Sequence, residues 1–139
     1  MSKFSLELIE EYPYQVYGIA ASAQDYRLCW HLNKELGLKF TRQKAISVYN
    51  KRKESINHEV FIYEDEDAVA KYRLIQNKRT GSLFLPEVNE ADYLLVIDES
   101  PVLDYDSLVI KIKNIRPVLM VFPIDLDALK NKQNLLLTA

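Results

Sequence analysis

Residues 22–37 read SAQDYRLCWHLNKELG and carry the clearest structural signal in the chain. Ser22 is a residue type that favours a helix N-cap, and Asp25 follows three positions later, as in a capping box. Gly37 suits the left-handed turn that commonly ends a helix. The stretch therefore predicts a helix over residues 22–36.

This predicted helix has a wide apolar side. At 100° per residue, its apolar side chains span an arc of about 200°, and the polar Asn33 lies inside that arc. The apolar members are Tyr26, Leu28, Cys29, Trp30, Leu32 and Leu36. Because an arc of about 100° is enough to pack on one sheet face, we expect a second surface to cover Tyr26 and Trp30. That surface is a loop, a neighbouring helix or another subunit.

Strand-like segments lie on both sides of the helix. Residues 14–20 precede it and are rich in aromatic and β-branched side chains. Further strands are expected at residues 40–49, 58–63, 68–77, 92–98 and 118–122, with the acidic run 64–67 as a turn. The segment 92–98 is almost continuously apolar, as expected for a strand that is covered on both faces.

Two more helices are expected near the end of the chain. Apolar residues recur at helical spacing after Asp104, until Pro117 stops the run, and residues 125–131 suit a short last helix. The order of elements predicts an α+β fold, a mostly antiparallel sheet with two main helices on one face. A ferredoxin-like (split βαβ) arrangement is compatible with this order.

The length of 139 residues predicts a single domain over residues 1–139, with a loose tail from about residue 131. The net charge of −2 provides no field that would attract nucleic acid or an anionic membrane. The longest apolar runs, 93–97 and 118–122, are far shorter than the roughly 20 residues that span a bilayer. A lone cysteine and the lack of a signal-peptide pattern predict a cytoplasmic location.

Residues 85–93 read LPEVNEADY. This stretch resembles the signature of the bacterial IPExxxVDY family, with Leu85 in place of Ile and Ala91 in place of Val. Residues 25–37 and 125–137 resemble the same family. The resemblance implies a bacterial cytoplasmic protein, of the Bacteroidetes group, and it implies no catalytic residues.

Polar residues near the predicted strands and helix have two interpretations each. Glu87 and Asp92 are either turn and cap residues that bind loop amides or ligands for a bound molecule. Asp25 is a helix cap or an exposed carboxylate, and Asn33 is a satisfied core amide or a ligand or interface residue. With Tyr26 and Trp30, these are the candidate ligand or interface residues.

No stretch of the chain predicts catalysis, a metal site or a cofactor. His31 and His58 have no second histidine or cysteine at metal-ligand spacing, and both are expected at the surface. Cys29 is expected to fill the core with a raised thiol pKa. The basic clusters 51–53 and 78–79 are interpreted as solvated surface, with single-stranded nucleic acid as the alternative.

These observations favour a non-enzymatic protein-interaction or self-associating module, a homodimer for example. The reasons are the wide apolar arc of the predicted helix and the nine tyrosines, a residue type enriched at interfaces. The alternative is a small-ligand-binding regulatory domain with a pocket near Asp25, Asn33 and Asp92. An enzyme without a recognisable motif comes third.

Overall fold

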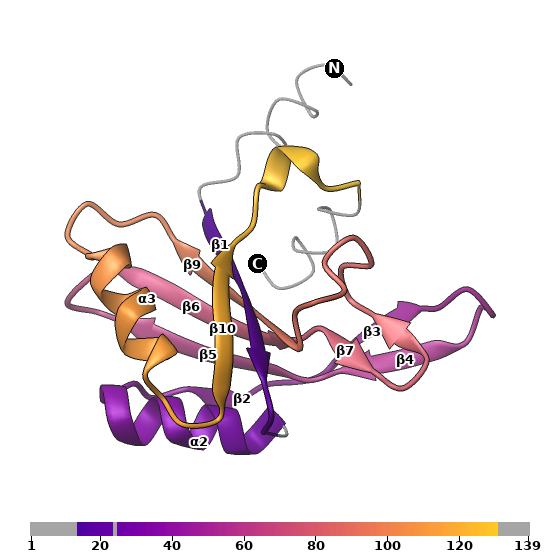
Figure 1. Ribbon diagram of the computed structural model, residues 1–139, viewed down its shortest axis with the longest axis horizontal. Helices are drawn as coiled ribbons and strands as arrows, with labels where there is room; N and C mark the ends of the chain where they lie inside the picture. The colour runs from indigo at the N-terminus through magenta and orange to yellow at the C-terminus, as the bar shows by residue number, and fades with distance from the viewer. Residues whose placement is uncertain (1–13, 24, 131–139) are drawn as a thin grey trace.

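The computed structural model describes residues 14–23 and 25–130, and of Asp25 the backbone alone (Figure 1). The tail expected from about residue 131 lies outside these described residues. Within them, no helix combines the length and the apolar character needed to cross a membrane.

The centre of the fold is a six-stranded sheet in the order β10-β1-β9-β6-β5-β2. Its strands are β1 (Tyr14–Ala21), β2 (Thr41–Arg42), β5 (Val60–Asp65), β6 (Ala70–Gln76), β9 (Tyr93–Asp98) and β10 (Val118–Pro123). Every neighbouring pair is antiparallel. Two small hairpins join β3 (Ile46–Tyr49) to β4 (Ser55–His58) and β7 (Lys78–Arg79) to β8 (Ser82–Leu83).

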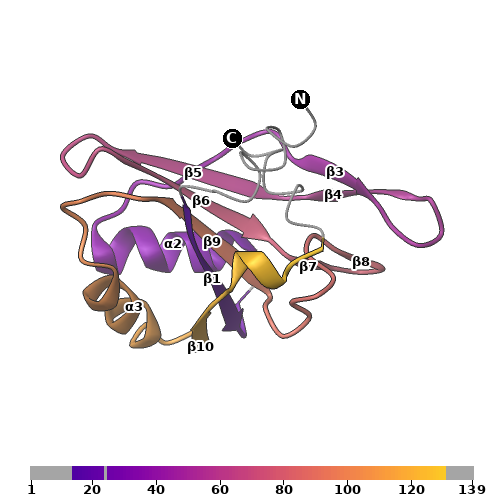
Figure 2. The same ribbon diagram turned by 90° about the horizontal axis from the view of Figure 1, so that it is seen from above.

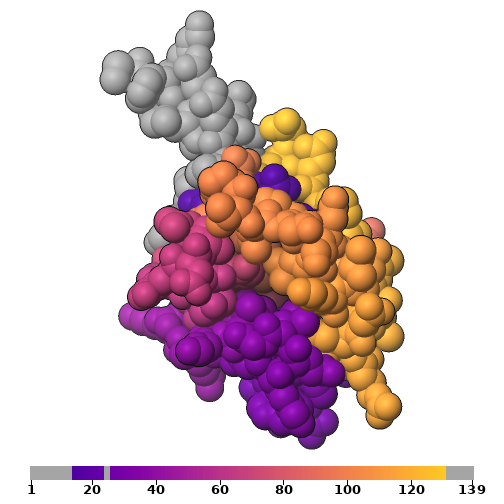
Figure 3. Space-filling view, turned by 90° about the vertical axis from the view of Figure 1, so that its left-hand side faces the viewer, coloured from indigo at the N-terminus to yellow at the C-terminus, as the bar shows by residue number. Residues whose placement is uncertain are grey.

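Two helices and one 3-10 turn complete the architecture. They are α2 (Asp25–Leu36), α3 (Tyr105–Lys113) and η1 (Leu126–Ala128). Both α-helices lie on the same side of the sheet, as Figure 2 shows, and Figure 3 shows α2 in violet near α3 in orange at the surface. The prediction of an α+β fold with a mostly antiparallel sheet and two main helices is confirmed.

The sheet separates two apolar cores. On the helix side, Ile19 and Ile97 from the sheet pack with Leu28 and Leu32 from α2 and Ile112 from α3, all completely buried. On the other side, the chain between β8 and β9 covers the sheet with further buried side chains, Phe84, Leu85 and Val88, which pack on Ile75 and Leu94. Strand β9 is therefore covered on both faces, which explains its almost continuous apolar sequence.

The start of α2 corrects the predicted N-cap. The helix begins at Asp25, and Ser22 lies outside it, directly after the last residue of β1 that pairs with β10, Ala21. The backbone N–H of Ser22 donates to the Pro117 carbonyl at 2.9 Å, and its hydroxyl donates to the same oxygen at 3.4 Å. The predicted end is confirmed, since Gly37 has a φ of +68°.

The segment 40–49 is not one strand, as the sequence suggested. Its first part is β2 in the main sheet, and its last part is β3, which pairs with β4 in a separate hairpin. The predicted strand 58–63 likewise spans the end of β4 and the start of β5. Alternating side chains reveal extended backbone but not its partner, so the pattern could not locate these breaks. The expected helix at 125–131 is the shorter η1.

Candidate functional site

The clearest exposed feature is a row of side chains on one flank of α2. Tyr26, Trp30 and Lys34 follow one another at intervals of four residues, so they form a continuous ridge, which we call the α2 ridge. Tyr26 is 58% exposed and Trp30 is 54% exposed. The Lys34 ammonium lies 4.7 Å from the centroid of the Trp30 ring, and the His31 ring meets the same indole edge-on at 4.9 Å.

The rotation of α2 that exposes this ridge is set by its buried side and by Asn33. The side-chain amide of Asn33 donates to the Phe40 carbonyl at 3.1 Å and accepts from the Phe40 N–H at 2.8 Å. Asn33 is therefore a satisfied structural amide that joins the helix to the segment after it. With Leu28 and Leu32 facing the sheet, no loop or helix in the described part of the chain covers both aromatic rings.

A hollow of about 350 Å³ lies beside Tyr26, between α2 and the β2 edge of the sheet, lined also by Arg42, Glu59, Phe61 and Arg79. The Arg42 guanidinium binds the Glu59 carboxylate through two hydrogen bonds, of 2.8 Å from Nε and 2.6 Å from Nη2. Glu59 is buried, and its carboxylate is occupied by Arg42. The Arg79 guanidinium donates to the neutral Gln76 amide oxygen at 3.2 Å.

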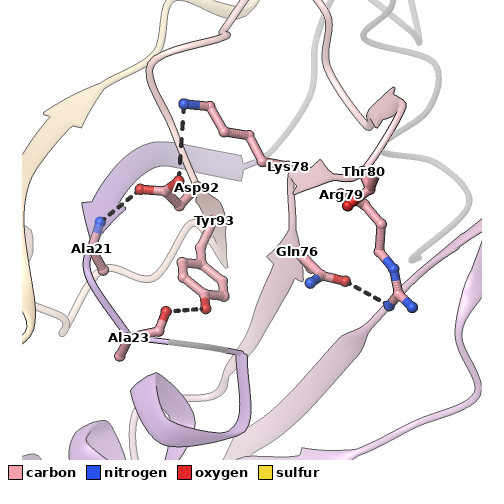
Figure 4. Close-up of a pocket in the computed structure, with 8 residues that line it drawn as sticks. All are labelled: Ala21, Ala23, Gln76, Lys78, Arg79, Thr80, Asp92 and Tyr93. Carbon is pink, nitrogen blue, oxygen red and sulfur yellow. Dashed lines mark hydrogen bonds and ion pairs between the residues drawn. The ribbon is translucent and has the colours of Figure 1, made fainter.

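Arg79 also lines a second hollow of about 500 Å³ (Figure 4). In it, the Asp92 carboxylate accepts from the Ala21 N–H at 2.9 Å, and its other oxygen lies 3.9 Å from the Lys78 ammonium. The Tyr93 hydroxyl donates to the Ala23 carbonyl at 2.6 Å. We call the two adjoining hollows the basic cleft, after Arg42, Lys78 and Arg79, which contribute its three positive charges.

The structure brings together only some of the predicted site residues. Asp92 lines the larger hollow and Tyr26 the smaller one. Helix α2 starts at Asp25, next to Ala23 of the larger hollow, but the side chain of Asp25 lies outside the described part. Asn33 is near the other end of the helix, so the predicted pocket near Asp25, Asn33 and Asp92 does not include it.

Glu87 and Asp92 both accept hydrogen bonds from backbone N–H groups, Asp92 from Ala21 at the end of β1. Glu87 lines neither hollow, and its carboxylate accepts from the Lys130 N–H. The stretch between them is organised by Asn77, a residue that the sequence analysis did not single out. The buried Asn77 amide donates to the carbonyls of Val88 and Ala91 and accepts from the Leu85 N–H, at 2.8–2.9 Å.

The residues that the sequence analysis missed had weak signals. Glu59 and Phe61 sit in an extended segment, and Arg42 and Arg79 looked like ordinary solvated charges. No local pattern links them to α2, and Glu59, Phe61 and Arg79 lie many residues away from it in the chain. A buried asparagine such as Asn77 also resembles any turn residue until its partners are known.

The expectation of a surface position is wrong for His58. Its side chain is completely buried, with Nδ1 2.7 Å from the Gln76 carbonyl and Nε2 2.8 Å from the Ser82 hydroxyl. His31 is partly exposed and lies 3.6 Å from Glu35 on the surface of α2. Among the described residues, no group of three or more histidine, cysteine, aspartate or glutamate side chains is arranged to hold a metal ion.

Cys29 fills the core, as expected. It is 7% exposed, and burial raises the pKa of its thiol to about 11. Such a thiol carries almost no thiolate at neutral pH, so it is a poor nucleophile.

Comparison with known proteins gives no assignment, because no protein-family model and no curated protein matches this chain. The resemblance of residues 85–93 to the IPExxxVDY family therefore stays a prediction.

Proposed function

We propose that the chain is a non-enzymatic protein-interaction module that binds an acidic segment of a protein partner along the α2 ridge and the basic cleft. The observation that carries the proposal is the exposure of Tyr26 and Trp30, at 58% and 54%, on a well-anchored helix. Aromatic side chains are enriched at protein interfaces, where they contribute large apolar area with little loss of side-chain entropy.

The charges next to the ridge indicate the chemistry of the partner. Lys34 ends the ridge, and Arg42, Lys78 and Arg79 line the adjoining cleft. Arg42 is matched by the buried Glu59, whereas the Arg79 guanidinium meets a neutral amide and Lys78 is only loosely paired with Asp92. Two copies that met through this face would bring like charges together, so an acidic segment is the better occupant.

The test is a selection of displayed random peptides on the intact chain, followed by binding measurements with the enriched peptide. We expect enrichment of Asp and Glu beside apolar residues, and an affinity that falls with added salt. Trp30→Ala should weaken binding by about tenfold or more, because interface tryptophans are common hot spots. The matched control is Tyr49→Ala, which removes an aromatic ring that is 75% exposed elsewhere and should leave affinity unchanged.

Two results would overturn the proposal. One is an enriched peptide whose affinity is the same for the Trp30→Ala variant. The other is that acidic peptides do not bind, whereas oligouridine binds in a way that depends on Trp30. That result would identify single-stranded nucleic acid as the occupant.

The larger hollow favours a second candidate function, a regulatory domain for a small anionic ligand. Lys78 and Arg79 line this hollow of about 500 Å³ next to the hydrogen-bonded Asp92. A thermal-shift screen of phosphate, nucleotides and amino acids should then show stabilisation that Arg79→Ala abolishes. A screen without any stabilisation argues against this candidate and leaves the peptide proposal untouched.

We also infer a ferredoxin-like core formed by β10, β1, β9 and β6 with the two helices. In this subset of the sheet, β1 lies between β9 and β10, and the chain passes from β9 to β10 through α3. Likewise, β9 lies between β1 and β6, and the connection from β1 to β6 contains α2. This arrangement supports a split βαβ pattern. Elements β2 to β5 would be an insertion that widens the sheet. Cross-strand NMR contacts that gave a different strand order would refute this inference.

For location, we propose the bacterial cytoplasm. The buried free thiol of Cys29 suits a reducing compartment, and the resemblance of residues 85–93 points the same way. Fractionation of cells that produce the chain with a small epitope tag tests this proposal.

A further inference from the structure

We propose that the outer edge of β10 pairs with β10 of a second copy of this chain, so that two sheets join into one. Strand β10 is the last strand of the main sheet and pairs on one side only, with β1. The described part of the chain provides no strand on its other side. An edge strand of this kind is a template for pairing with another strand.

The register shows which backbone groups face outward. In an antiparallel pair, alternate residues direct their N–H and C=O groups toward the partner strand. The Ile124 N–H donates to the Val16 carbonyl at 2.9 Å, and Phe122 is opposite Gly18. Residues 120, 122 and 124 therefore face β1, whereas Val121 and Pro123 direct their backbone groups away from it.

These outward groups complement themselves. In an antiparallel pair centred on Val121, the two Val121 residues exchange two hydrogen bonds. Pro123 has no N–H to donate, so pairing stops there, and the short strand forms a closed two-fold pair rather than an open array.

The side chains along this edge are suited to burial. Strand β10 reads VLMVFP and contains no charged residue, although exposed edges are usually protected by charges. Leu119 is 71% exposed and Met120 is 46% exposed. Two consecutive exposed side chains occur because the register shifts between Ala20 and Ala21, opposite this part of β10. The other edge of the sheet differs, since β2 is only two residues long.

Charge complementarity selects a second copy as the occupant. The exposed Arg116 precedes β10, and the exposed Asp125 and Asp127 follow it. An antiparallel pair of β10 strands puts the start of one strand beside the end of the other. The segment with Arg116 of each copy then lies at the same end of the pair as the segment with Asp125 and Asp127 of the second copy, and the two-fold symmetry repeats this attraction.

The inference is independent of the proposed function. The α2 ridge adjoins β2, at the opposite end of the sheet from β10. A pair joined at β10 therefore leaves both ridges accessible at its two far ends. Such a pair would present two binding faces to a partner, which raises its avidity when the partner carries two matching segments.

The first test is sedimentation equilibrium of the full chain over a wide range of concentration. We expect a dimer, and we expect the double variant Leu119→Lys and Met120→Lys to dissociate about tenfold or more readily, since both lysines would lie at the shared edge. Val102→Lys is the matched control, because Val102 is 69% exposed outside β10 and its replacement should not change the mass. Circular dichroism confirms that each variant is folded.

The second test uses charge reversal. Arg116→Glu and Asp127→Lys should each weaken the dimer, because each puts like charges together twice. Mixed in equal amounts, the two variants should form a heterodimer, because Glu at 116 then meets Lys at 127 and both contacts are attractive again. A wild-type chain that stays monomeric overturns the inference. So does a dimer that survives the lysine substitutions but is lost in Trp30→Ala, which would place self-association on the α2 ridge instead.

Discussion

Nε2 of His58 lies 2.8 Å from the Ser82 hydroxyl oxygen, and this contact ties the end of β4 to the start of β8. The other ring nitrogen, Nδ1, lies 2.7 Å from the Gln76 carbonyl, which can only accept. Nδ1 therefore carries the proton, and Nε2 accepts from the hydroxyl. The ring is neutral and completely buried, so a proton added to Nε2 would place a positive charge in the interior and would require the Ser82 hydroxyl to turn from donor to acceptor.

We predict that the chain loses stability in mildly acidic solution because of His58. Burial lowers the pKa of His58 below 6.5, Arg79 lowers it further, and the Gln76 hydrogen bond partly opposes them. Between the folded and unfolded pKa values the unfolded chain binds more protons. This contribution is therefore complete above about pH 6.5 and is lost as the pH falls toward the folded value.

The measurement is urea denaturation at several values between about pH 8 and about pH 5.5. His58→Gln should remove this component of the pH dependence. His31→Gln should retain it, since His31 is partly exposed on α2. If the free energy of unfolding of the His58→Gln variant falls with decreasing pH as steeply as that of the wild-type chain, other groups are responsible.

We predict that Asn77→Asp destabilises the fold by about 3 kcal/mol or more. The substitution conserves shape but removes both donors that bind the carbonyls of Val88 and Ala91, and it puts a carboxylate where the side chain is completely buried. Chemical denaturation measures the loss. Asn89→Asp is the control in the same loop, where the side chain is exposed, and it should change stability by less than about 0.5 kcal/mol.

We predict that Val69→Gly stabilises the turn between β5 and β6. Val69 has a φ of 51° and is 80% exposed, so a β-branched residue occupies the left-handed region with little packing in return. Relief of this strain should exceed the entropic penalty of glycine and raise the free energy of unfolding by about 1 kcal/mol. At Val102, where φ is not positive, replacement by glycine should instead lower the free energy of unfolding. Thermal denaturation of both variants distinguishes the two effects.

We predict that Cys29 reacts slowly with thiol reagents while the chain is folded. Its side chain is 7% exposed, and burial raises the thiol pKa to about 11, so little thiolate is present at about pH 8. Labelling with a chromogenic disulfide should be at least about a hundredfold slower than in urea, where the pKa returns to its ordinary range. Equal rates in the two conditions would contradict the buried position.

The sequence alone was sufficient for the elements whose signal lies in neighbouring residues. The body of α2 and its end at Gly37, the apolar strand β9 and the helix that follows Asp104 were all predicted at nearly their observed positions. In each, periodicity or a residue with a special backbone requirement acts within a few positions. Tertiary contacts did not alter these elements.

Only the tertiary structure decided which segments meet. The division of residues 40–49 between two sheets, the burial of His58 and the gathering of Arg42 and Arg79 beside Tyr26 depend on partners distant in the chain. The position of β10 at the edge of the described sheet is also visible only once the strand order is known. A sequence records where apolar and polar groups occur. The partner of each group is set by a choice among several similar strand pairings, and the pairing that forms is the one that buries the most surface without leaving polar atoms unsatisfied.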